Sequence, residues 1–138
     1  MSRDVVADFC TIIRNAVAVK KRVVDIPYST FKERIASVMK DEGYLKGYQV
    51  ILLDAVKKNL RIFPKYLSGA PAITEIKSIS TCGSRVYCSG NKLWPLKNGY
   101  GIRILSTNQG VMSDRKARSF VYDGKKICLG GEVICTLW

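Results

Sequence analysis

The segment from Gly99 to Arg118 constrains the fold more than any other part of the chain. Apolar residues at 102, 104 and 105 predict a strand, and four neutral hydrogen-bonding side chains follow at 106–109. Gly110 then offers a positive φ, after which Ser113 predicts the N-cap of a short basic helix. Taken alone, this polar loop is most simply a surface turn, although it could also enter a nucleic-acid groove without carrying charge of its own.

Helical periodicity predicts two helices in the first half of the chain. Apolar residues recur at helical spacing over 4–18, with Ser2 as the candidate cap. A second helix is expected over 30–42, opened by a capping box of Thr30 and Glu33. The other features expected in this half are a helix stop at Gly43, a strand at 23–27, a hairpin of 44–53 with 60–66, and Pro64 at a sheet edge or near the end of its strand.

The pattern becomes mostly β beyond a small, turn-rich linker at 67–72. We therefore expect an α+β fold of two small subdomains. Residues 1–68 would pack N-terminal helices on a short antiparallel sheet, and residues 69–138 would be mostly β with a short helix. The elements expected in the second half are strands at 73–79, 84–88, 102–105 and 133–138, a turn at 82–83, and a hairpin over 120–127 around Asp123-Gly124.

The charge balance indicates a large polyanionic partner. The formal net charge is +12, and residues 1–69 carry 13 Lys and Arg against 7 acids while residues 70–138 carry 10 against 4. Positive charge spread over a folded body makes nucleic acid the leading candidate. A membrane partner is not expected, because we find no basic amphipathic helix with bulky apolar anchors and no long apolar run or signal peptide. We expect a soluble, intracellular protein.

Missing residue types argue against an enzyme. The chain has no histidine, which removes the usual general base and the histidine-containing catalytic and zinc sites. Its five cysteines are an odd number without C-x-x-C spacing, so we interpret them as small buried hydrophobes in a reducing compartment. We expect no catalytic residues, no metal and no cofactor.

Several runs together resemble the bacterial-type eighth protein of the small ribosomal subunit. The most specific are Arg85-Val-Tyr87, Asn98-Gly-Tyr-Gly-Ile102, Leu105-Ser-Thr-Asn-Gln-Gly110 and Gly130-Gly-Glu-Val-Ile134, before a terminal tryptophan. They occur in the family's order over nearly the whole chain.

The resemblance implies a protein that binds the central domain of small-subunit ribosomal RNA early in assembly. It implies that loop 106–110 is the principal RNA contact, in the minor groove of an irregular helix with unpaired bases, with Tyr87 and Glu132 near it. It also implies that the N-terminal subdomain touches further RNA through its basic surface. The implied neighbours are the fifth and twelfth small-subunit proteins, and some family members repress their own operon messenger. The implied location is a cytoplasmic ribosome, with an organellar one left open.

The residue types fit this role independently of the family. Hydroxyl and amide groups both donate and accept, which suits the 2′-hydroxyls in the shallow minor groove of A-form RNA. Tyr87 could stack on a splayed base or lie in the core, and Glu132 could accept from the loop or be a plain surface acid. The candidate RNA-binding residues are Ser106, Thr107, Asn108, Gln109, Gly110, Tyr87, Glu132, Arg85, Arg14, Asn15, Lys20, Lys21, Arg22 and Lys32.

Two departures from the family pattern stand out. Ile12 occupies a position that is usually basic, and the segment 119–129 is longer than usual. Lys125 and Lys126 in that segment could extend an RNA footprint or solubilise a protruding hairpin, and we favour the second. The alternative function is a stand-alone RNA- or DNA-binding regulator, such as a translational repressor.

Overall fold

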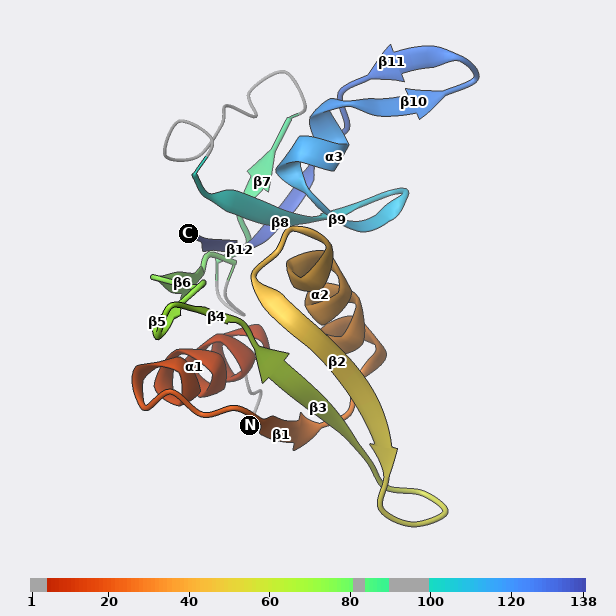
Figure 1. Ribbon diagram of the computed structural model, residues 1–138. Helices are drawn as coiled ribbons and strands as arrows, with labels where there is room; N and C mark the ends of the chain where they lie inside the picture. The colour runs from red at the N-terminus through yellow and green to blue at the C-terminus, as the bar shows by residue number, and fades with distance from the viewer. Residues whose placement is uncertain (1–4, 81–83, 90–99) are drawn as a thin grey trace.

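The computed structural model describes residues 5–80, 84–89 and 100–138 and has the expected α+β architecture (Figure 1). Helices α1 (Val5–Ala18) and α2 (Thr30–Asp41) pack against an antiparallel sheet of order β1-β3-β2. The strands of this sheet are β1 (Val24–Pro27), β2 (Leu45–Leu52) and β3 (Lys58–Pro64). None of the helices in the described residues is long and apolar enough to cross a membrane.

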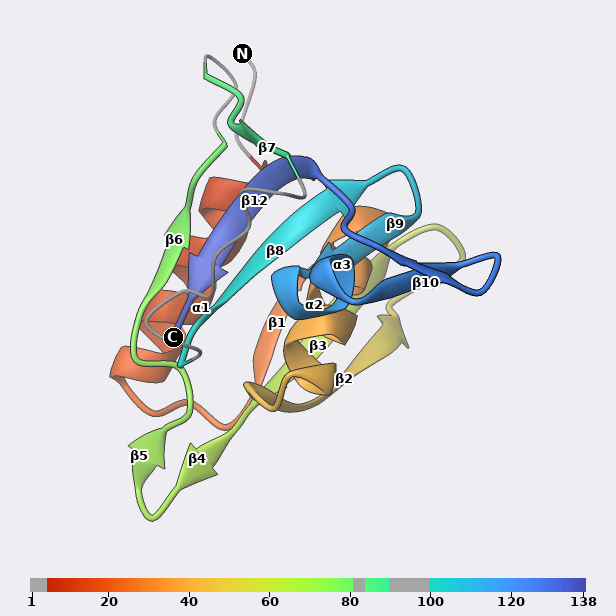
Figure 2. The ribbon, with the colours of Figure 1, turned by 90° about the horizontal axis from the view of Figure 1, so that it is seen from above.

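The second half forms a sheet of order β6-β12-β8-β9, with β7 also paired to β12 (Figure 2). Its strands are β6 (Ile76–Ser78), β7 (Tyr87–Cys88), β8 (Ile102–Thr107), β9 (Gly110–Ser113) and β12 (Gly131–Leu137). The short helix α3 (Asp114–Arg118) follows β9. Two small hairpins complete the chain, β4 (Tyr66–Leu67) with β5 (Ala70–Pro71) and β10 (Phe120–Tyr122) with β11 (Lys125–Ile127).

Strand β8 divides the apolar interior because its side chains alternate between the two faces of the sheet. Ile102 and Ile104 join a large cluster that also holds α1, α2 and β3 side chains, so this cluster draws on both halves of the chain. Leu105 belongs to a smaller cluster on the opposite face. The smaller cluster contains Leu105, Met112, Ala117, Leu129 and Val133. The subdomain boundary at residues 68 and 69 stays a prediction.

Local capping corrects one expectation. Ser29, not Thr30, is the N-cap of α2, and its side chain makes no cap hydrogen bond. Glu33 instead accepts a hydrogen bond from the Tyr28 hydroxyl at 2.6 Å. At the other end, Gly43 follows the C-cap with φ +87° and donates to the carbonyl of Lys40, as the stop signal predicted.

Of the remaining expectations, one is confirmed and two change. Pro64 lies at the end of its strand, which is the second of the two positions left open, since β3 is the central strand and not an edge. The expected linker at 67–72 contains the β4–β5 hairpin, and β9 is a strand that the sequence did not reveal. The expected cap Ser2 and the turn at 82–83 lie outside the described residues.

The cysteines are only partly the buried hydrophobes expected. Cys10 on α1 and Cys135 on β12 are buried, Cys88 is half-buried and Cys128 is exposed, all as free thiols. A hydrogen bond with Cys10, together with burial, raises the pKa of Cys135 well above its ordinary value. The prediction is therefore wrong for Cys128, and Cys82 lies outside the described residues.

Asp114 anchors α3, and its replacement by Asn should destabilise the fold. Its buried carboxylate accepts from Arg118 Nη1 at 2.8 Å and lies 3.6 Å from Arg103 Nη1. Removing the charge weakens both contacts, so Asp114→Asn should lower the free energy of unfolding by about 1–3 kcal/mol in urea titrations. Asp123→Asn, at an exposed turn that favours Asn, is the matched control. Equal effects of the two variants would contradict this role of Asp114.

Candidate nucleic-acid interface

The polar loop is the tip of the β8–β9 hairpin. Ser106 and Thr107 end β8, Asn108 and Gln109 form the turn, and Gly110 begins β9. The expectation that the loop leads directly into the helix is thus wrong, because β9 pairs back along β8 before α3 begins. The turn is therefore held by a ladder on both sides.

Thr107 fixes the shape of this turn. Its hydroxyl donates to the carbonyl of Gly110 at 2.8 Å and accepts from the backbone N–H of Gln109 at 3.2 Å. Gly110 has φ +109°, where a residue with a Cβ would be strained. Asn108 and Gln109 are exposed at the tip. Thr107 and Gly110 shape the turn, while the two amide side chains face solvent.

The residues expected near the loop lie in one row across the sheet. Glu132 on β12 is directly opposite Tyr87 on β7 and directly opposite Ser106 on β8. Directly opposed residues place their side chains on the same face of a sheet. We call Tyr87, Glu132 and Ser106 the turn row. Its position at the β8–β9 end of the sheet brings three of the predicted residues together.

The side chains of the row also settle two open alternatives. Tyr87 is 71% exposed, so it is not a core residue. The carboxylate of Glu132 pairs with Arg85 Nη1 at 3.2 Å, and its side chain is 24% exposed. Within the part of the chain that the structure describes, Glu132 therefore has Arg85 rather than a loop hydroxyl or amide as its partner, and it is not a plain surface acid.

Gly131 allows β12 to approach β8 closely at this row. A Cβ at Gly131 would collide with the carbonyl oxygen of Ser106 and come within 3.2 Å of Thr107 Cα. Steric space therefore explains the second glycine of the Gly-Gly-Glu run, because a side chain at Gly131 would push the end of β8 away. The close approach fixes Glu132 relative to the turn.

The second group of predicted residues lies far from the turn row. Figures 1 and 2 both place the C-terminal end of α1 and the β8–β9 turn at opposite sides of the molecule. Lys20, Lys21 and Arg22 follow α1 and are exposed, with Lys20 held at φ 56°. The Tyr66 hydroxyl donates to the carbonyl of Lys21 at 2.5 Å, and burial raises the pKa of Tyr66. This hydrogen bond tethers the basic segment to the body of the fold.

The remaining predicted residues make contacts within the fold. The Arg14 guanidinium donates to the carbonyl of Ile76, which joins α1 to β6, and Asn15 is exposed beside it. Lys32 Nζ donates to the carbonyl of Pro27 at 3.2 Å. The structure does not bring these three to the turn row, and their role in binding stays a prediction.

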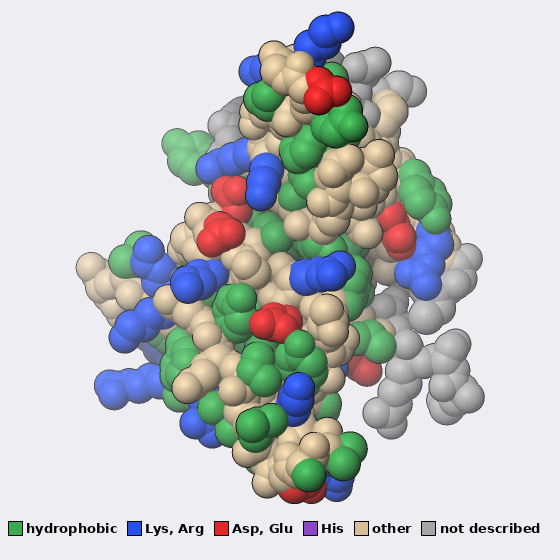
Figure 3. Space-filling view, turned by 90° about the vertical axis from the view of Figure 1, so that its right-hand side faces the viewer, with side chains coloured by type: hydrophobic (Ala, Val, Ile, Leu, Met, Phe, Trp, Pro, Cys, Tyr) green, Lys and Arg blue, Asp and Glu red, His purple; other side chains and the backbone are tan. Residues whose placement is uncertain are grey.

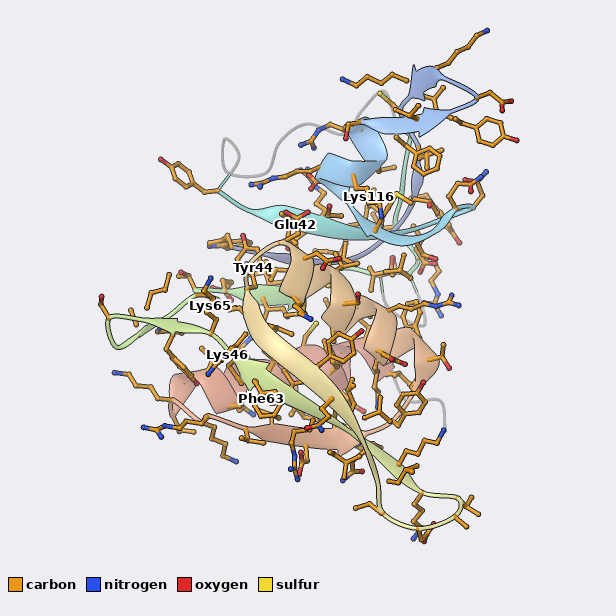
Figure 4. All side chains as sticks on the ribbon, turned by 45° about the vertical axis from the view of Figure 1, so that its right-hand side comes forward. Glu42, Tyr44, Lys46, Phe63, Lys65 and Lys116 are labelled. Carbon is orange, nitrogen blue, oxygen red and sulfur yellow. The ribbon has the colours of Figure 1, made fainter. Side chains whose placement is uncertain are left out.

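Sequence reasoning missed a basic and aromatic hollow beside Arg22. Arg22, Lys46, Phe63 and Tyr66 line this shallow hollow together with Val23 and Pro64, and none of these described lining residues is acidic. Figure 4 shows Lys46 and Lys65 close to Phe63 on the flank of β2 and β3. We call Lys20, Lys21, Arg22, Lys46 and Lys65 the second basic surface. The alternation of β3, which buries Leu60 and Ile62, was the available signal for Phe63 pointing outward.

Arginines and lysines differ in whether they form ion pairs within the fold. Every ion pair found among the described residues joins an arginine to an acid, and no lysine takes part in one. One example is Glu42, which lies 3.6 Å from Arg115 and accepts from the Ser113 hydroxyl at 2.7 Å. Figure 3 shows Lys and Arg side chains outnumbering the acidic ones on the face it displays. The described lysines thus have no acidic partner, although Lys40, Lys58 and Lys77 lie over aromatic rings of the fold.

Comparisons with known proteins point in one direction. The family model described as "Ribosomal protein S8" matches residues 4–138. The small ribosomal subunit protein uS8 of Pseudomonas savastanoi pv. phaseolicola is 44% identical over 136 residues, which cover 99% of this chain and 98% of that protein. The protein of the same name from Geobacter sulfurreducens is 43% identical over 136 residues, covering 98% and 97%.

Replacing Gly131 by Ala should disturb the turn row. The added methyl group collides with backbone, which cannot rotate away, so we expect a loss of about 1–3 kcal/mol in the free energy of unfolding. Gly47→Ala is the control, because a Cβ at Gly47 on β2 meets nothing within 4 Å. The two variants should differ clearly in urea unfolding. A Gly131→Ala protein as stable as Gly47→Ala would contradict the close approach.

Proposed function

The chain belongs to the ribosomal protein S8 family, and from this premise we propose that it binds the central domain of small-subunit ribosomal RNA and helps to assemble that part of the subunit. As a member of this family it is a structural component of the small ribosomal subunit and not an enzyme. The finer statement, which RNA it binds and through which residues, is the proposal developed here.

The turn row is the observation that carries the proposal. An uncharged tip with exposed Asn108 and Gln109 stands beside an exposed tyrosine, Tyr87, and both are held by paired strands. Hydroxyl and amide groups suit the 2′-hydroxyls and base edges of an RNA minor groove, and an aromatic ring suits an unstacked base. We propose that Asn108, Gln109 and Ser106 enter the groove while Tyr87 stacks on an unpaired base.

Glu132 has a positioning role in this proposal. Its carboxylate holds Arg85 on the same face of the sheet, 3.2 Å away. Arg85 is exposed and stands beside Tyr87 in the chain, so its remaining N–H groups can reach a phosphate next to the stacked base. The ion pair thus orients a cation at the edge of the groove.

The second basic surface supports a separate contact with the RNA backbone. Its lysines make no ion pairs among the described residues, and phosphate contacts of this type supply affinity without reading sequence. Because this surface lies on the opposite side from the turn row, we propose that it meets a different RNA segment. Contacts with the fifth and twelfth small-subunit proteins and with an operon messenger remain predictions of the resemblance.

Sedimentation separates this function from that of a stand-alone regulator. A ribosomal component should travel with small subunits in a high-salt gradient, whereas a regulator should stay in the soluble fraction. An endogenous tag on the full chain, followed by immunodetection across the gradient, gives the answer directly.

The double variant Ser106→Ala/Asn108→Ala should weaken binding to a central-domain RNA transcript. It leaves Thr107 in place, so the turn keeps its hydrogen bonds while two RNA-facing groups are removed. At about 1 kcal/mol or more for each lost buried hydrogen bond, filter binding should show an affinity loss of about thirtyfold. The control Ser37→Ala/Asn59→Ala removes the same groups from α2 and β3, outside the turn row, and should bind normally. Unchanged binding by the first variant would refute the assignment of the turn.

Replacing Lys20, Lys21 and Arg22 by Gln should have a different signature. These residues would contact phosphates, so affinity should fall on any RNA and the slope of log affinity against log salt should flatten by about 1 per charge. With about six phosphate contacts, the parent chain should show a slope of about −5 on duplex RNA. A salt slope equal to that of the parent would place the backbone contacts elsewhere.

A further inference from the structure

The β10–β11 hairpin projects from the fold separately from the β8–β9 turn and contains no residue of the turn row. It forms a two-stranded sheet of its own, closed by a turn in which Asp123 has φ 51° and Gly124 has φ 73°. Isolated two-stranded ribbons are marginally stable in water. A hairpin of this size therefore depends on how it is anchored.

The root of the hairpin is fixed to the smaller apolar cluster. Phe120 packs against this cluster, and Leu129 is one of its buried members. The backbone N–H of Leu129 donates to the carbonyl of Ala117 on α3 at 2.9 Å. Because both strands are held at their root, the tip extends as a defined arm.

Both faces of the arm combine an exposed apolar side chain with a lysine. Tyr122 is directly opposite Lys125, and Val121 is directly opposite Lys126. Tyr122 is 56% exposed and Val121 is 62% exposed. Neither lysine has an ion-pair partner within the ranges that the structure describes. The arm thus offers an aromatic ring and two uncompensated charges.

The arm and the β8–β9 turn project from the same side of the molecule. Figures 1 and 2 both show this common direction, and Figure 3 looks onto that side, with Lys or Arg side chains at its upper end. The two projections share a foundation, since Leu105 and Met112 of the β8–β9 hairpin pack in the same cluster as Leu129. A large molecule bound at the β8–β9 turn would therefore lie alongside the β10–β11 hairpin.

We propose that the β10–β11 hairpin is an additional contact for the RNA bound at the turn row, with Lys125 and Lys126 on phosphates and Tyr122 on a neighbouring ribose or unpaired base. This inference rests on the proposed function. The segment 114–127 carries five Lys and Arg against two Asp, and the carboxylate of Asp114 is already buried against arginines. A polyanion such as RNA complements the net positive charge of this segment.

A protein partner fits the arm less well than RNA. On one face Tyr122 and Ile127 are exposed with Lys125 directly opposite Tyr122, and on the other Val121 is exposed with Lys126 directly opposite it. A lysine therefore borders the exposed apolar side chains on each face, whereas protein interfaces are marked by larger apolar patches. Our proposal therefore departs from the preference from sequence, which favoured lysines that solubilise a protruding hairpin.

The test compares Lys125→Gln/Lys126→Gln with Lys57→Gln/Lys58→Gln in the full chain. The control removes two adjacent lysines from the β2–β3 hairpin, whose tip lies away from the β8–β9 turn in Figure 1. Filter binding to a central-domain RNA transcript over a salt series should show the slope flattening by about 2 for the first variant and not for the control. Hydroxyl-radical footprints should lose the protection flanking that of the turn, while the protection at the turn persists.

A third variant, Tyr122→Ala, tests the aromatic contact with charge unchanged. It should lower affinity about fivefold or more if the ring stacks on a base, and circular dichroism melting should show that the fold is kept. Equal salt slopes for the two lysine variants, or an unchanged footprint, would overturn the inference while the turn assignment stands. Normal RNA binding with reduced incorporation into small subunits would also overturn it, in favour of a protein contact. Absence of any protection at the turn in the parent chain would overturn the proposed function as well.

Discussion

The pairing of β12 with β8 is the interaction on which the rest of the structure depends. On one face of this pair, Ile104 and Cys135 join the large apolar cluster that reaches α1 and β3. On the other face, Leu105 and Val133 form the smaller cluster beneath α3 and the β10–β11 hairpin. Both clusters are therefore built on the same two strands. A register shift of one residue would turn every side chain of the shifted strand to the opposite face of the sheet.

The same pairing sets the geometry of the candidate interface. Glu132 can stand between Tyr87 and Ser106 only because β12 has β7 on one side and β8 on the other. The bulge between Val133 and Cys135 shifts the register so that apolar residues on both sides of it are still buried. Gly131 then removes the side chain that would hold the two strands apart. A flexible surface loop would not have these constraints, so the turn is presented in one orientation at low entropic cost on binding.

Much of the fold could be predicted from the sequence, because helix periodicity and turn chemistry are local. The ranges 4–18 and 120–127 matched α1 and the β10–β11 hairpin closely. Strand β9 was missed because its four residues show no clear alternation and continue directly into the cap of α3. The sequence left Pro64 either at a sheet edge or near the end of its strand, because strand order is a tertiary property; the structure has the second, with Pro64 as the last residue of the central strand β3, at the register shift between Leu45 and Gly47.

The site was less predictable than the fold. The residues of the turn row are 87, 106 and 132, which only pairing across three strands brings together. Resemblance to a family indicated their proximity, but the ion pair of Glu132 with Arg85 depends on coordinates. The second basic surface likewise combines a segment after α1 with side chains of β2 and β3, so charge counting showed its sign but not its place.

Arginines and lysines have different partners in this fold, and this difference connects its stability with its proposed binding of RNA. Arginine can bind a carboxylate through several N–H groups in a fixed plane, and here Arg61, Arg85, Arg115 and Arg118 all pair with acids of the fold. Lysine is a flexible point charge that gains little from a single exposed acid and adapts to phosphates at variable positions. Four of the acids, Asp25, Glu42, Asp114 and Glu132, are thereby held by arginines. A chain with few acids can in this way have a specifically held interior and still carry an excess of positive charge on its exterior.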